Sequence, residues 1–145
     1  MQVPWYLTAI SCAVIWGIHY PLIDFAVKRI SIYSVLLISV LPVFFLMPAF
    51  MRTLADDIDT FRLLSTSEQL IIAAVSITST LGAVLIYISI DNKNATLASL
   101  IEITYPIFVV LFAYLFFKQM HVNASVIIGG VMILSGAGLI IYNNQ

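Results

Sequence analysis

The sequence predicts an all-α membrane protein whose helices cross the bilayer about five times. Of its 145 residues, 62% are hydrophobic and 9% are charged, and the mean hydropathy is +1.09, far outside the range of water-soluble domains. The apolar residues form long runs, and a crossing helix needs about 20 of them. The length leaves no room for a sizeable soluble domain, so we expect no enzyme activity.

The charged residues exclude one class of partner. The formal net charge is -1, and the six Lys and Arg residues form no cluster larger than Lys28-Arg29, so no basic surface is available for nucleic acid. The single cysteine, Cys12, lies in an apolar run and cannot form a disulfide within the chain. No residue grouping predicts a metal site or a cofactor, and the expected surroundings are the lipid bilayer.

Five uninterrupted apolar runs predict the crossing helices. They cover about residues 5–27, 32–51, 68–90, 95–117 and 124–142. The connections at 28–31, 91–94 and 118–123 are very short, which makes sequential helices antiparallel neighbours. We therefore expect residues 1–145 to form one membrane domain.

The first predicted helix, 5–27, has one mildly polar face. Thr8, Cys12 and His19 share it, with Trp16 beside them. His19 lies below the interface, where its ring is either a satisfied packing group or part of a substrate or proton path. Pro21, inside the run, removes a backbone donor and is expected to bend the helix.

The second predicted helix, 32–51, contains Pro42, which is expected to bend it. The long connection that follows, 52–67, has apolar residues at helical spacing and acidic residues turned mostly elsewhere: Leu54, Ile58, Phe61 and Leu64 against Asp56, Asp57 and Asp59. This pattern fits a short helix lying in the membrane interface. An irregular solvated loop is the alternative.

The third and fourth predicted helices carry polar stripes. In 68–90 the stripe contains Ser76, Thr80 and Tyr87; in 95–117 it contains Ser99, Glu102 and Pro106, with Tyr105 at its margin. The small and hydroxyl residues are also explained by close helix packing.

Glu102 is harder to explain by packing. It lies about 10 Å below the start of its helix, too deep for its side chain to reach water easily. It is either protonated and hydrogen-bonded inside the bundle or faces a hydrated cavity, where it can exchange a proton or pair with a cation. Pro106 follows one turn later on the same face, so polarity and an expected kink coincide.

The fifth predicted helix, 124–142, has no charge and is rich in glycine: Gly129, Gly130, Gly136 and Gly138. Gly129 and Gly136 are seven residues apart, which gives a smooth surface for close helix packing. The spacing does not say whether the packing partner belongs to the same chain.

The positive charges are balanced across the membrane. Five crossings put the termini on opposite sides, and the basic residues divide into Arg52, Arg62 and Lys118 against Lys28, Arg29 and Lys93. A fixed orientation usually gives an excess on one side. The balance favours insertion both ways round and an antiparallel dimer; orientation set by a partner or by helix hydrophobicity, and chance, are the alternatives.

The segment NATLASLIEITYPIF from Asn94 to Phe108, with the following VVLFAYLFFKQ and IIGGVMILSGAGLII, resembles the EamA domain of the drug/metabolite transporter superfamily. Trp16-Gly17 is also similar to that domain's opening. The resemblance implies two inverted five-helix repeats, a substrate cavity between them, alternating access and a bacterial or archaeal inner membrane. The chain looks like one repeat, which a second copy would complete to ten helices.

The resemblance also extends to the small multidrug resistance transporters, which pair as antiparallel dimers and have a similar glycine heptad. Those proteins carry a glutamate in their first helix, and many EamA domains end the fourth helix with one. This chain has neither, since its fourth helix is followed by Lys118-Gln119. The small multidrug mechanism of cation export is therefore not supported.

We expect a dimeric transporter of small organic solutes or metabolites. Its path would be lined by Glu102, His19, Trp16, Tyr87, Tyr105, Ser99, Thr80 and Ser76. Pro106, Pro21 and Pro42 would bend the helices, and the four glycines of 124–142 would pack against a partner. A non-transporting scaffold or accessory subunit is the alternative from another class, and flipping of an amphiphile is an alternative within transport.

Overall fold

A computed structural model of the chain describes residues 4–120 and 122–144, and this part is helical throughout, with no strand. Five helical stretches in it are long and apolar enough to cross a membrane: Trp5–Val27, Ile32–Leu63, Thr66–Asn92, Ala95–Phe117 and Ala124–Asn143. The predicted all-α class and the predicted number of membrane-spanning helices are confirmed.

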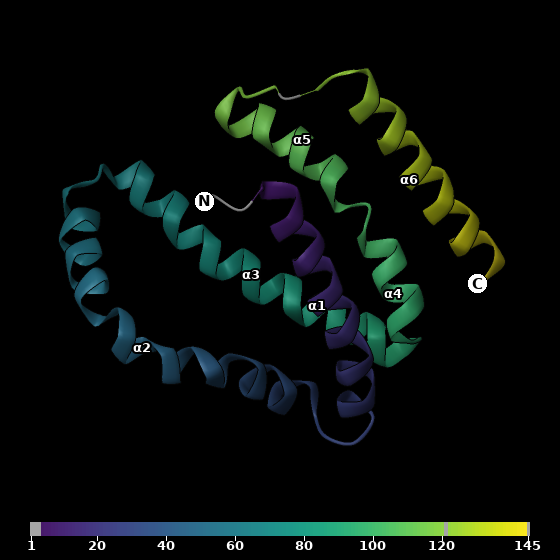
Figure 1. Cartoon of the computed structure of the whole chain (residues 1–145), viewed down its shortest axis with the longest axis horizontal. Coiled ribbons are helices and arrows are strands. Elements are labelled where there is room, and N and C mark those ends of the chain that lie inside the picture. The colour runs from purple at the N-terminus through teal and green to yellow at the C-terminus, as the bar shows by residue number, and fades with distance from the viewer. Residues whose placement is uncertain (1–3, 121, 145) are drawn as a thin grey trace. The chain divides into compact units, whose positions relative to one another are not determined.

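The chain divides into two compact units. Helix α1 (Trp5–Val27) contributes to both, because the division falls between Pro21 and Leu22. The unit of residues 22–91 contains the end of α1, α2 (Ile32–Leu63) and nearly all of α3 (Thr66–Asn92). The other unit combines the chain up to Pro21 with α4 (Ala95–Glu102), α5 (Tyr105–Phe117) and α6 (Ala124–Asn143) (Figure 1).

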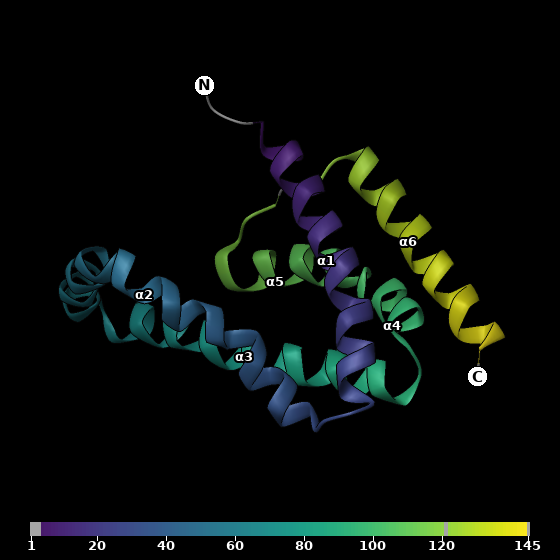
Figure 2. The same cartoon turned by 60° about the horizontal axis from the view of Figure 1, so that its bottom comes forward.

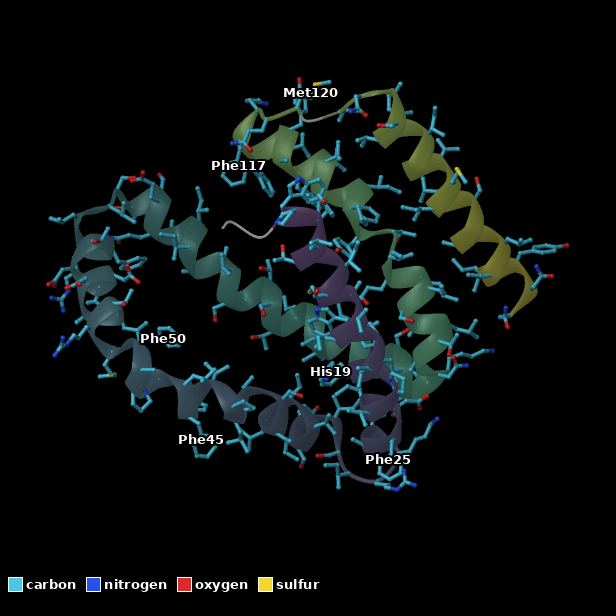
Figure 3. The ribbon with its side chains drawn as sticks, viewed as in Figure 1. His19, Phe25, Phe45, Phe50, Phe117 and Met120 are labelled. Atoms are coloured by element: carbon cyan, nitrogen blue, oxygen red, sulfur yellow. The ribbon has the colours of Figure 1, made fainter. Side chains whose placement is uncertain are left out.

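Helix α2 is longer than the sequence predicted. It was expected to end at Met51, but it continues to Leu63, so the first part of the expected connection is helical and an irregular loop there is wrong. The helix includes Pro42 and Pro48 without interruption. The helix changes direction along its length (Figures 1 and 2), near Phe50 (Figure 3). Pro48 is close to this point, and the ring and missing N–H of a proline bend a helix.

Side chains at the junction of α2 and α3 complete the backbone hydrogen bonds. The Gln69 side-chain amide donates to the carbonyls of Phe61 and Leu64, at 3.0 and 3.2 Å. The Ser65 N–H donates to the Glu68 carboxylate at 2.9 Å, and the Glu68 N–H donates to the Ser65 hydroxyl at 3.4 Å. This reciprocal capping box fixes the start of α3.

The predicted fourth helix, 95–117, is broken in two. Helix α4 ends at Glu102 and α5 begins at Tyr105. Pro106 has no N–H to donate to the Glu102 carbonyl, and its ring clashes with that carbonyl in a straight helix. The break therefore falls where the sequence placed a kink, but it separates two helices rather than bending one.

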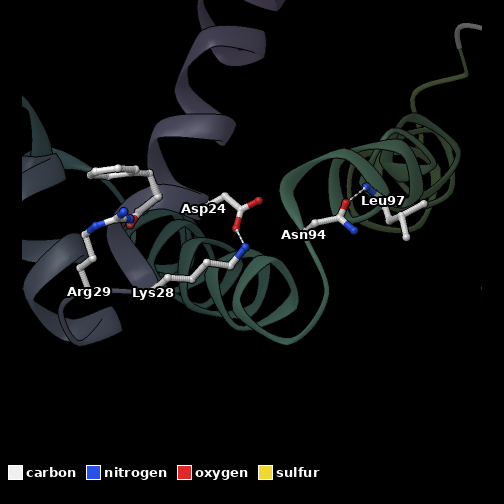
Figure 4. A network of polar contacts seen from close by, with 6 residues as sticks. Asp24, Lys28, Arg29, Asn94 and Leu97 are labelled. Carbon is white, nitrogen blue, oxygen red and sulfur yellow. Dashed lines mark hydrogen bonds and ion pairs between the residues drawn. The ribbon is translucent and has the colours of Figure 1, made fainter.

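The ends of α4, α5 and α6 carry ordinary capping signals. The Asn94 side chain accepts a hydrogen bond from the Leu97 N–H at 2.9 Å (Figure 4), and the Asn123 side chain accepts one from the Val126 N–H at 3.0 Å. Helix α5 ends at Lys118 in the left-handed conformation (φ 55°), a common helix terminator. The Lys93 ammonium donates to the Asn144 carbonyl at 2.9 Å, which ties the start of α4 to the end of α6.

Few side chains are buried within either unit. In residues 22–91 they are Ile23, Val27, Val35, Tyr87 and Ile90, and in the other unit Ala95, Ala98 and Ala137. Helix α4 contacts α6, and its small buried alanines allow that approach. Most large apolar side chains of the described helices are exposed, so lipid or other helices have to cover them.

Candidate functional site

Glu102 is hydrogen-bonded to a residue of another helix. The Tyr20 hydroxyl, on α1, donates to Oε2 of Glu102, the last residue of α4. Both side chains are half-buried and belong to the same unit. The bond satisfies part of a carboxylate that would otherwise be costly inside a membrane.

The two partners lie at matching depths. Tyr20 is seven residues before the end of α1 at Val27, and Glu102 is seven residues after the start of α4 at Ala95. With five crossings, the end of the first span and the start of the fourth face the same side of the membrane. Each residue is then about 10 Å below that side.

Aromatic rings of α1 surround the Tyr20 end of this pair. The Trp16 ring lies 5.5 Å from the Tyr20 ring and 5.2 Å from the His19 ring, edge-on to the latter. Trp16 is 47% exposed. His19 lies on the same helix (Figure 3). The arrangement offers a hydrogen-bonded carboxylate beside aromatic faces, which can attract a cation.

Five of the eight predicted path residues share this unit, and three of them, Glu102, His19 and Trp16, contact Tyr20. Tyr20 was missed, because it lies outside the helix face of Thr8, Cys12 and His19 that was identified as polar. Its equal depth with Glu102 was the signal that could have revealed it.

Ser99 and Tyr105 belong to the same unit but are not bonded to Glu102. The Ser99 hydroxyl donates to the Thr96 carbonyl at 3.1 Å, a bond within its own helix. Tyr105 starts α5 and is 59% exposed. Contact of either residue with a substrate stays a prediction.

The predicted residues of α3 lie in the other unit and have local partners there. The Thr80 hydroxyl donates to the Ser76 carbonyl at 2.9 Å. Tyr87 is buried, and its hydroxyl is 3.0 Å from the Ser39 hydroxyl of α2. Ser39 was not singled out from the sequence. Whether these residues line a path stays a prediction.

Charged residues near the end of α1 pair with their own helix or its extension. Lys28 forms an ion pair with Asp24 (Figure 4), and the Arg29 guanidinium lies 3.3 Å from the centre of the Phe25 ring. Lys28 and Arg29 are exposed and follow directly after the end of α1. In residues 4–120 and 122–144, no group of three or more His, Cys, Asp or Glu residues is placed to hold a metal ion.

The glycine surface of α6 is mostly open. A Cβ on Gly130 would lie 3.7 Å from Ile107 of α5, whereas one on Gly129, Gly136 or Gly138 would meet nothing within 4 Å. An apolar groove of about 350 Å³ lies between α5 and α6, with Pro106 and Gly130 among its lining residues. Packing of this surface against a partner stays a prediction.

The model of the EamA-like transporter family matches residues 3–142, a range that includes all five membrane-spanning stretches and the Tyr20–Glu102 pair. No curated protein and no solved structure matches the chain significantly.

Proposed function

Because the chain belongs to the EamA-like transporter family, part of the drug/metabolite transporter superfamily, we propose that it carries small organic solutes or metabolites across a membrane by alternating access. The family consists of transporters rather than enzymes. Together with the five apolar helices, it makes the chain an integral, multi-pass membrane protein. The proposed membrane is the inner membrane of a bacterium or archaeon.

The hydrogen bond between Tyr20 and Glu102 carries the proposal. It joins two spans at matching depth, involves an ionisable group, and lies beside rings that are partly exposed. Ionisable groups inside membrane spans usually mark a substrate or ion path. The helix break before Pro106 adjoins this carboxylate and provides a place where α4 and α5 can move relative to each other.

We propose that the working form is a homodimer of two five-helix repeats. Two observations support a second copy: the exposed apolar side chains of all the described helices, and the open glycine surface of α6. The three-to-three division of basic residues supports antiparallel pairing. Reporters fused to the carboxyl terminus should then be found on both sides of the membrane, and a terminus on one side only would exclude dual insertion.

Transport is tested with the purified full-length chain in liposomes, using a panel of labelled amines, amino acids and sugars. We expect uptake of at least one class, and Glu102→Gln should lower its rate about tenfold, because the variant loses a charged binding group. The exposed Asp57 of α2 provides the control substitution Asp57→Asn, which should leave the rate unchanged. Equal rates for Glu102→Gln and the parent would remove Glu102 from the mechanism.

The open glycine surface also favours a second candidate, a scaffold or accessory subunit that packs against a larger membrane protein. The oligomeric mass of the chain in detergent separates the two. A self-associated dimer supports the transporter, and an obligate complex with a different protein supports the accessory role.

A further inference from the structure

We propose that Tyr20 is a binding-site residue that occupies the Glu102 carboxylate until a substrate displaces it, and that the substrate is a small organic solute with a protonated amino group. This inference rests on the proposed function and names its substrate class. It depends on the chemistry of the Tyr20–Glu102 pair and of the two rings beside it.

Glu102 has one described side-chain partner. The ion pairs in the described part of the chain join Asp24 to Lys28 and Asp59 to Arg62, so neither involves Glu102. The Tyr20 hydroxyl donates to Oε2 of this carboxylate, so a ligand that binds this atom has to displace it. An ionised carboxylate only accepts hydrogen bonds. The competing ligand must therefore be a donor, and a positively charged donor binds a carboxylate most strongly.

The rings beside the pair favour the same ligand. The ring centre of Trp16 is 5.2 Å from that of His19 and 5.5 Å from that of Tyr20. Nearly half of the Trp16 surface is exposed. An ammonium group is attracted to the face of an aromatic ring, while its apolar part can lie against the indole. A carboxylate-bearing anion without an amine would instead be repelled by Glu102.

The Tyr20 hydroxyl already donates to the atom of Glu102 that such a ligand would bind. It supplies Glu102 with one neutral donor, and a substrate ammonium would supply a charged one, so one hydrogen bond is exchanged for a stronger one. The exchange also frees the Tyr20 ring to move relative to Trp16. Tyr20 thereby competes with the substrate, and removing its hydroxyl should tighten binding.

Trp16 provides a direct readout of this exchange. The chain has two tryptophans, and the Trp5→Phe variant leaves Trp16 as the single indole, 5.5 Å from the Tyr20 ring. The full-length variant in detergent is titrated with benzylamine, with benzyl alcohol as the neutral analogue and benzoate as the anionic one. We expect a saturable change in Trp16 fluorescence with benzylamine alone.

Variants in the same background identify the residues. Glu102→Gln should abolish the benzylamine signal, and Tyr20→Phe should lower the dissociation constant about fivefold because the internal hydrogen bond no longer has to break. Tyr142→Phe removes an exposed tyrosine hydroxyl of α6 and should change nothing. Circular dichroism of each variant confirms that it is folded.

The inference is overturned if benzylamine gives no saturable signal, if benzyl alcohol binds equally well, or if Tyr20→Phe binds benzylamine no more tightly than its parent. These outcomes are independent of transport. Benzylamine binding with no uptake of any solute in liposomes would remove the transport function and keep the site. Uptake of solutes that is insensitive to Glu102→Gln, with no benzylamine binding, would remove the proposed binding site and keep the transport function.

Discussion

Each of the two units contains a tyrosine that forms a hydrogen bond between helices, and the two tyrosines differ in partner and exposure. Tyr87 is 4% exposed and pairs with the neutral Ser39 hydroxyl, whereas Tyr20 is half-buried and donates to the carboxylate of Glu102. A pair of hydroxyls with a buried tyrosine as one member satisfies itself and stabilises packing. An accessible pair with an ionisable member keeps capacity for a ligand. We therefore expect the Tyr87–Ser39 pair to have a structural role and propose that the Tyr20–Glu102 pair belongs to a binding site.

The largest expected effect is on stability, at Tyr87. Tyr87→Ala should lower the free energy of unfolding by about 3–5 kcal/mol, because it leaves a cavity where an aromatic ring was buried. Tyr20→Ala should have a smaller effect, since part of that ring is already exposed. Thermal unfolding in detergent measures both. A larger loss for Tyr20→Ala would reverse the assignment.

The next effect is on transport, at Glu102. We expect Glu102→Gln to reduce the rate about tenfold while the melting temperature changes little, because an amide can still accept the Tyr20 hydrogen bond. Liposome uptake and thermal unfolding of the same preparation measure the two quantities. A loss of transport matched by a loss of folded protein would make Glu102 a structural residue like Tyr87.

A smaller effect is expected at Ser39. Ser39→Ala should destabilise the chain by about 1 kcal/mol, the usual contribution of one hydrogen bond, with no change in transport. Tyr87→Phe should do the same, and the double variant should be less destabilised than the sum of the two. Strict additivity would mean that the two hydroxyls do not interact.

The smallest effect is expected at the helix break beside Glu102. Pro106→Ala restores a backbone donor and should join α4 to α5, so we expect about threefold slower transport if the break serves as a hinge. Pro4→Ala, at an exposed position before α1, is the control and should leave the rate unaltered. Faster unfolding of the Pro106→Ala variant would argue against the expected continuous helix.

Much of the fold was predictable because membrane-spanning helices depend on one property, the length of an apolar run. The break near Pro106 also followed from a local rule, the missing N–H of proline. The end of α2 did not, because the segment from Arg52 to Leu63 is too polar to read as part of a crossing helix although its spacing is helical. The capping box of Ser65 and Glu68 marks where α3 begins and was overlooked.

The site was predicted only in part. Glu102 stood out because a carboxylate is rare in an apolar run. Its partner Tyr20 did not stand out, because tyrosine is common in apolar runs. In addition, a hydrogen bond between helices depends on how the helices are rotated about their axes. Such rotations are set by packing, which a single sequence leaves undetermined. The same reason explains why the contact between the Tyr87 and Ser39 hydroxyls was not predicted.

The length of α2 has a consequence for the surfaces outside the bilayer. A helix of 32 residues has an axis of about 48 Å, longer than the roughly 30 Å of hydrocarbon, and α2 changes direction near Phe50 (Figure 3). We therefore expect its charged end after the bend to lie outside the hydrocarbon. If two copies pair in opposite orientations, one such charged end lies on each face of the membrane. Antibody fragments raised against residues 52–63 would then bind on both sides of a single vesicle population, because the proposed dimer exposes the same segment on both faces of the membrane.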